Sequence, residues 1–166
     1  MDIVAPRKGR TAMRRYLRGF TIIELMITLA VVAVLAALGL PAFDGAFERS
    51  RASTEANDLA QALNYGRLEA INRSQSVTVE PTDSNAGWAA GITIKQSSDD
   101  AVLRTVPAMS SGAAVAEENG ADAIVFNSFG GLNSPSAAVA FTYTLSDQNK
   151  VVAVCLSGRI QVGVCN

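Results

Sequence analysis

The hydrophobic pattern divides the chain into three stretches. Residues 20–40 are apolar at nearly every position, and Glu24 is the only charged residue among them. As a helix, these 21 residues would be about 31 Å long, which matches a bilayer core of about 30 Å. Residues 42–73 repeat apolar side chains at helical spacing, and the remainder alternates apolar and polar residues in short runs. The pattern therefore predicts an anchor helix, an amphipathic helix and a β-rich region.

The second stretch predicts one amphipathic helix over residues 42–73. Its apolar positions recur at steps of three and four residues, and polar side chains occupy the opposite face. The apolar set is Ala52, Ala56, Leu59, Ala60, Leu63, Gly66, Ala70 and Ile71. Gly66 weakens the helix locally but lets another element approach closely. Such a face has to cover another surface, and the β-rich region supplies one.

The third stretch predicts an antiparallel sheet. Its β-branched and aromatic segments are residues 76–80, 88–95, 102–106, 123–127, 139–145, 151–156 and 160–164. Turn-forming sequences lie between them at residues 82–87, 96–100 and 128–136. The sequence shows no internal repeat and no long linker. The predicted fold class is α+β, with one long helix packed on an antiparallel sheet.

Charge is distributed unevenly along the chain. Six of the 14 basic residues precede residue 19, where Asp2 is the only acid. From Phe20 onward there are eight basic and fourteen acidic residues, a formal balance of −6. A basic segment before an apolar run stays in the cytoplasm by the positive-inside rule. The acidic remainder disfavours broad binding of nucleic acid, which needs an excess of Lys and Arg.

Composition excludes several kinds of chemistry. The chain has no histidine, which removes His-dependent triads, HExxH zinc sites and imidazole acid–base catalysis. No motif indicates an enzyme, a cofactor or a metal site. The two cysteines, Cys155 and Cys165, both lie in the last twelve residues. If that part of the chain is exported, a disulfide between them is the expected state.

The charged residue Glu24 helps to distinguish between the possible roles of the apolar run at residues 20–40. An ordinary membrane anchor explains the length and the basic flank, but a carboxylate inside it costs about 2.5–3.5 kcal/mol on insertion scales. A cleaved secretory signal is the second alternative, with small residues near Ala36 and Ala37 as the cleavage site. Its apolar region would span only about 7–15 residues, so this run is too long for it.

The junction at residues 18–25, RGFTIIEL, closely resembles the type IV prepilin signal, with Ile22 where leucine is usual. A basic leader, Gly before Phe, Glu four residues after Phe and a long apolar run stand together in register. The resemblance implies that a prepilin peptidase cuts between Gly19 and Phe20 and then methylates Phe20. The implied domains are a leader peptide (1–19), a transmembrane and filament-packing helix (20–41) and a periplasmic globular head (42–166).

Spacing predicts a role for Glu24, and the resemblance implies one for Pro41. Phe20 and Glu24 are four residues apart and share a helix face. We expect the Glu24 carboxylate to pair with the α-amino group of Phe20, in the same or a neighbouring subunit, and so to act in assembly. The alternative is a Glu24 side chain that extends to the membrane surface. Pro41 stands where pilins carry a helix-breaking proline, and termination of the helix at the membrane edge is the other interpretation.

Residues 63–73, LNYGRLEAINR, and the strand VTV at 77–79 resemble the GspH/FimT family of minor pilins and secretion pseudopilins. The usual pattern is L-x-x-A-R-x-E-A-I-x-R, so Gly66 replaces an alanine. Segments that also fit are Gly87-Trp88, Phe126-Asn127-x-Phe129-Gly130 and Ser157-Gly158-Arg159. The resemblance implies a structural minor pilin in the bacterial inner membrane, with a single pass and other minor pilins as partners. A pseudopilin H of type II secretion, incorporated in a pseudopilus, is the alternative.

A second alternative is DNA uptake. Some FimT-type proteins bind DNA through a C-terminal Gly-Arg-x-Arg sequence, and this chain has Gly158-Arg159-Ile160-Gln161, without the second arginine. Phosphate contacts need clustered positive charge, and Arg159 with Lys150 is a thin patch on an acidic protein. A hairpin turn with one exposed arginine is therefore the favoured interpretation of this segment.

Overall fold

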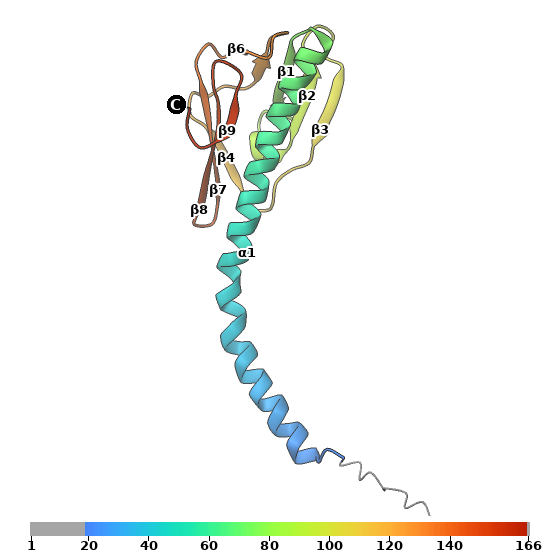
Figure 1. The fold of residues 1–166 in the computed structure, drawn as a ribbon, viewed down its shortest axis with the longest axis vertical. Coiled ribbons are helices and arrows are strands. Elements are labelled where there is room, and N and C mark those ends of the chain that lie inside the picture. The colour runs from blue at the N-terminus through green and yellow to red at the C-terminus, as the bar shows by residue number, and fades with distance from the viewer. Residues whose placement is uncertain (1–18, 166) are drawn as a thin grey trace, which may run out of the picture. The chain divides into compact units, whose positions relative to one another are not determined.

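The computed structural model describes residues 19–165, which divide into two compact units after Pro41 (Figure 1). The helices are α1 (Ile22–Arg73) and the short 3-10 helix η1 (Trp88–Ala90). The strands are β1 (Val77–Pro81), β2 (Ile92–Gln96), β3 (Val102–Val106), β4 (Ala114–Glu117), β5 (Ile124–Phe126), β6 (Leu132–Ser134), β7 (Val139–Leu145), β8 (Gln148–Val154) and β9 (Ile160–Val162). The α+β class is thus confirmed.

The head, from Ala42 onward, contains two antiparallel sheets instead of the single sheet that was predicted. The five-stranded sheet has the order β3-β2-β1-β5-β6, and the four-stranded sheet has the order β4-β7-β8-β9. Residues 107–113 carry the chain from β3 in one sheet to β4 in the other. The predicted packing of a long helix on antiparallel strands is confirmed, but the division into two sheets was not predicted, because hydrophobic periodicity identifies strands but not their partners.

The core of the head lies between the helix and both sheets. Leu59 and Leu63 of α1 are fully buried in one core cluster with Val79 and Ile94 of the five-stranded sheet and Phe141 of the four-stranded sheet. In Figure 1 the head part of α1 lies in front of the sheets, with β3 on its right and β7–β9 on its left. Each such leucine contributes about 1.5–3 kcal/mol of burial free energy. This burial explains the apolar face predicted for residues 42–73.

At Gly66, β1 approaches the helix closely. A Cβ added there would lie 2.5 Å from Cγ2 of Val79, closer than real side chains approach one another. Helix α1 then ends at Arg73, where Ser74 takes a left-handed φ of 53° and the Gln75 N–H donates to the Ala70 carbonyl at 3.1 Å. The end predicted from the fading helical pattern is therefore confirmed.

Several strand predictions need correction. β3 and β7 have the predicted bounds, but Trp88 lies in η1, where its ring and the Phe141 ring form a T-shaped pair with centroids 4.8 Å apart. β6 lies within residues 128–136, which were predicted to be a turn, and β4 was not predicted. β8 begins three residues earlier than expected, because a tight hairpin pairs Leu145 with Gln148 and places Ser146 at φ 50°.

Candidate functional site

The predicted processing site lies at the first described residues. Gly19 and Phe20 have no regular secondary structure, and α1 begins two residues after Phe20. Within the described residues, a Cβ added to Gly19 would meet no atom within 4 Å, and the Phe20 side chain is 78% exposed. The packing of the described chain therefore gives no reason for glycine at position 19. Cleavage between the two residues stays a prediction.

Thr21 caps the start of α1. Its Oγ1 accepts a hydrogen bond from the Glu24 backbone N–H at 3.3 Å, and its carbonyl accepts one from the Leu25 N–H at 3.1 Å. Glu24 is consequently the third residue of the helix, where the acid of a capping box stands and where the helix dipole favours negative charge. No role was predicted for Thr21, although Thr-x-x-Glu before an apolar run is a recognised helix-start signal.

The Glu24 carboxylate is exposed, and no ion pair is formed by it within residues 19–165. Its predicted partner is the α-amino group of Phe20. That group is an amide nitrogen as long as Gly19 is attached, and it becomes an amine only when the bond between the two residues is cut. The assembly role of Glu24 stays a prediction.

The first turns of α1 expose apolar side chains on all sides. The large ones, each more than half exposed, are Ile22, Ile23, Leu25, Met26, Ile27, Leu29, Val31, Val32, Val34 and Leu35. An apolar surface of this size marks contact with lipid or with other proteins. In the part of the chain that the structure describes, no helix combines the length and apolar character needed to cross a membrane. The transmembrane role of residues 20–41 stays a prediction.

Pro41 lies at the division between the two units and inside the bounds of α1. The side chains of residues 38–44 are not described. The predicted helix break at Pro41 stays a prediction.

In the head, three segments of the predicted family pattern meet. The Arg67 Nε donates to the Gly130 carbonyl at 2.9 Å, which joins α1 to the β5–β6 loop. Gly158, at φ 78° in the β8–β9 turn, lies so close that an added Cβ would overlap the Gly130 oxygen. The Leu132 N–H donates to the Leu156 carbonyl at 3.1 Å and completes the junction. Residues of the family pattern thus hold the two sheets and the helix together.

The β5–β6 loop is held by Asn127. Its Oδ1 accepts hydrogen bonds from the N–H groups of Phe129 and Gly131, each at 3.0 Å, and its carbonyl accepts from the Gly130 N–H at 2.8 Å. The Phe129 side chain is 90% exposed on this loop. A large aromatic side chain that is exposed on an ordered loop is a candidate contact residue for another protein.

Glu55 forms a second polar junction, which sequence reasoning missed. Its Oε1 accepts hydrogen bonds from the Ser110 N–H, at 3.1 Å, and from the Ser110 hydroxyl, while its Oε2 accepts from the Tyr143 hydroxyl at 2.6 Å. Burial raises the pKa of the Glu55 carboxyl, but these hydrogen bonds outweigh it and the net pKa is lowered. Burial and the bond to Glu55 raise the pKa of the Tyr143 hydroxyl. An ionised carboxylate therefore ties α1 to β7 and to residue 110.

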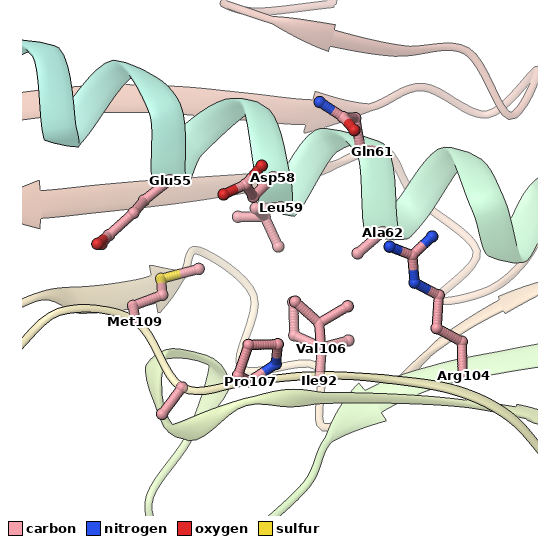
Figure 2. Close-up of a pocket in the computed structure, with 11 residues that line it drawn as sticks. Glu55, Asp58, Leu59, Gln61, Ala62, Ile92, Arg104, Val106, Pro107 and Met109 are labelled. Carbon is pink, nitrogen blue, oxygen red and sulfur yellow. The ribbon is translucent and has the colours of Figure 1, made fainter.

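A groove of about 320 Å³ lies beside Glu55, between α1 and the segment that runs from β3 to Met109 (Figure 2). Its floor is apolar, and Asp58 and Arg104 approach it from the helix and from β3. The Arg104 guanidinium also lies 5.1 Å from the centre of the Tyr65 ring. None of the lining residues is a His, Cys, Ser or Lys, so the groove offers no nucleophile with its base.

The predicted disulfide is confirmed. The sulfur atoms of Cys155 and Cys165 are 2.06 Å apart, and their Cα atoms are 5.7 Å apart. The chain folds back after β9 at Gly163, which has a φ of 112° and donates its N–H to the Val151 carbonyl at 2.8 Å. This left-handed residue places Cys165 beside Cys155, which a simple hairpin would not do. Among the described residues, no group of His, Cys, Asp and Glu is arranged to hold a metal.

Arg159 lies in the turn between β8 and β9. Its carbonyl accepts a hydrogen bond from the Cys155 N–H at 2.9 Å, and its side chain is exposed. Lys150, the other predicted basic residue, lies on β8 opposite Tyr143 and is half-buried. A role of Arg159 in DNA binding stays a prediction.

Two family models match the chain. The model of type II transport protein GspH matches residues 55–159, and the prokaryotic N-terminal methylation motif matches residues 14–40. The first contains the Glu55, Arg67–Gly130 and Gly158 contacts, and the second contains Gly19, Phe20 and Glu24.

Curated relatives include the type IV major pilin PilE1 of Neisseria gonorrhoeae, 36% identical over 87 residues, which are 47% of this chain and 52% of that one. Type II secretion system protein H of Xanthomonas campestris is 27% identical over 71 residues, covering 43% of this chain and 42% of that one. The chain thus spans about half the length, or less, of these curated relatives.

Solved structures of other proteins share the fold. The type IV minor pilin FimU of Pseudomonas aeruginosa has a TM-score of 0.62 at 22% identity, covering 70% of this chain and 91% of that one. The minor pseudopilin EpsH of the type 2 secretion system of Vibrio cholerae has a TM-score of 0.52 at 18% identity, covering 68% and 95%.

Proposed function

Since the chain belongs to the GspH family, whose members are structural pilin-like subunits and not enzymes, we propose that it is a minor pilin of a type IV pilus that acts in assembly or in the tip complex. One observation carries the proposal. A match to the N-terminal methylation motif precedes a head that matches the GspH model, and both stand in one chain.

In this proposal the protein is made as a precursor. A prepilin peptidase removes residues 1–19 on the cytoplasmic side and methylates Phe20 with a methyl donor. The open space around Gly19 and the exposure of Phe20 support this step, because neither residue is committed to packing within the described chain. Residues 20–41 then hold the protein in the bacterial inner membrane as a single pass, and the head lies in the periplasm.

Assembly follows from the exposed apolar surface of α1. In a filament, neighbouring subunits would cover these side chains, and Glu24 would lie in apolar surroundings. Pairing with the new α-amino group of Phe20 compensates that charge and sets the axial register between subunits. Removal of one partner of such a buried pair costs about 3–5 kcal/mol. The exposed Phe129 and the groove beside Glu55 are the parts of the head best suited to contact other minor pilins.

Mass spectrometry of the protein extracted from membranes tests the proposal. The expected N-terminus is a methylated Phe20, and the protein should be recovered with other minor pilins after crosslinking. A mature N-terminus near residue 42 would instead establish a conventional signal peptide. It would overturn both the processing step and the membrane anchor.

A pseudopilin H of type II secretion is the second candidate, and the family description and the fold shared with EpsH favour it. Deletion of the gene separates the two machines. Loss of surface pili with normal secretion of exoproteins supports the minor pilin, whereas retention of secreted enzymes in the periplasm with normal pili supports the pseudopilin.

A further inference from the structure

Thr21 determines where α1 begins. In a helix that continued toward the N-terminus, the Glu24 N–H would bond to the carbonyl four residues earlier, which belongs to Phe20. In the structure the Thr21 hydroxyl accepts from that N–H at 3.3 Å, and the Thr21 carbonyl makes the first intrahelical bond, from Leu25 at 3.1 Å. The hydroxyl therefore competes with the Phe20 carbonyl for one donor, and Gly19 and Phe20 remain outside the helix.

We infer that Thr21 is a positioning residue for leader removal, because its cap keeps the Gly19–Phe20 peptide bond in non-helical backbone where a peptidase can bind it. The inference rests on the proposed function, in which this bond is the one that is cut. It adds a residue outside the Gly, Phe and Glu positions that define the processing site, and it gives that residue a specific physical task.

The chemistry explains why the helix has to begin after the bond. In hydrolysis, the oxygen of a water molecule bonds to the Gly19 carbonyl carbon and the carbon–nitrogen bond breaks. The electron pair of the broken carbon–nitrogen bond stays on the Phe20 nitrogen, which takes up a proton. The products are a Gly19 carboxylate and a Phe20 amine. An enzyme has to hold the carbonyl oxygen with its own donors during this step. A helical Gly19 carbonyl would instead be occupied by the Ile23 N–H.

The local sequence indicates in which direction the helix would shift if the cap were lost. Gly19 is about as good a capping residue as threonine, whereas Ile22 and Ile23 are poor ones. In apolar surroundings an unpaired backbone N–H is costly, which favours additional helical bonds. Without the Thr21 hydroxyl, we therefore expect α1 to begin at Phe20 with Gly19 as its cap. The carbonyl of the scissile bond would then make the first intrahelical bond.

The test compares full-length precursors in detergent with purified prepilin peptidase. Thr21→Val keeps the shape of the side chain and removes the hydroxyl, and we expect kcat/KM for cleavage to fall about fivefold. Thr21→Ser keeps the hydroxyl and should be cleaved at the wild-type rate. Thr28→Val is the matched control, since Thr28 lies about two turns beyond Thr21 in the same helix and its hydroxyl donates to the Leu25 carbonyl at 2.8 Å. It should also be cleaved normally.

A second measurement separates positioning from loss of structure. The carbonyl ¹³C chemical shift of Gly19, labelled in each precursor, should move toward the helical value in Thr21→Val and remain unchanged in Thr21→Ser and Thr28→Val. Cleavage of Thr21→Val at the wild-type rate, or an equal loss of cleavage in Thr28→Val, would overturn this inference alone. Cleavage of the wild-type precursor at another bond would overturn the proposed function together with it.

Discussion

The junction of Arg67, Gly130 and Gly158 requires a glycine at position 158, and Gly158→Ala tests this requirement. Gly158 has a φ of 78°, and a Cβ at this position would overlap the carbonyl oxygen of Gly130. The obstacle is backbone, so it cannot move aside as a flexible side chain can. The β8–β9 turn and the β5–β6 loop would have to separate.

The magnitude follows from the contacts that such a separation breaks. A left-handed alanine costs about 1–2 kcal/mol. Displacement of Gly130 weakens its hydrogen bond with the charged Arg67 side chain, which is worth about 1.5–3 kcal/mol, and the nearby bond from Leu132 to Leu156 is worth about 1 kcal/mol. Gly158→Ala should therefore lower the free energy of unfolding of the head by up to about 3.5–6 kcal/mol if both hydrogen bonds are lost.

Urea denaturation of a soluble head lacking residues 1–47 measures this loss. Gly112→Ala is the matched control, because Gly112 has a similar φ of 87° but a Cβ there would meet no atom within 4 Å. Gly112→Ala should lower the free energy of unfolding only by the cost of a left-handed alanine, about 1–2 kcal/mol. Equal losses in the two variants would show that the contact with Gly130 contributes nothing and would refute the reasoning.

Three further predictions concern Glu24, Glu55 and Arg159. Glu24→Gln keeps a side chain that suits a capping box but removes the charge. Like Glu24→Ala, it should be cleaved and inserted normally but recovered poorly in sheared filaments. Recovery of Glu24→Gln at the wild-type level would refute charge pairing, and loss of cleavage alone would assign Glu24 to the peptidase step. Tyr143→Phe removes one donor to Glu55 and should cost the head about 1–2 kcal/mol at pH 7 but less at pH 3. The folded-state pKa of Glu55 is lowered, so the stabilisation from the ionised carboxylate is present above the unfolded pKa of about 4.3 and is lost as the pH falls through the folded pKa. If Tyr143→Phe lowered the urea midpoint of unfolding by the same amount at pH 7 and at pH 3, this prediction would be contradicted. At physiological salt, the head should bind duplex DNA weakly in a fluorescence anisotropy titration, because its charge is acidic, and sub-micromolar binding abolished by Arg159→Ala would promote the DNA-uptake function.

Local patterns in the sequence were sufficient for the features that depend on local interactions. The helical spacing of apolar residues ended at Arg73, as α1 does, because a helix is built from contacts three and four residues apart. The alternation at residues 139–145 predicted β7, whose burial alternates in the same way. The disulfide was predictable because the chain has only two cysteines.

The tertiary structure alone decided which distant residues meet. Residues 128–136 have the composition of a turn, yet β6 forms there because β5 pairs with it and the Leu156 carbonyl accepts the Leu132 N–H. Glu55 reaches Tyr143 across 88 residues, and Arg67 reaches Gly130 across 63. Periodicity carries no information about such pairs, since it records only which face of an element is apolar. The separation of the strands into two sheets, and the junctions that join those sheets to the helix, arise from packing between elements that are distant in the sequence.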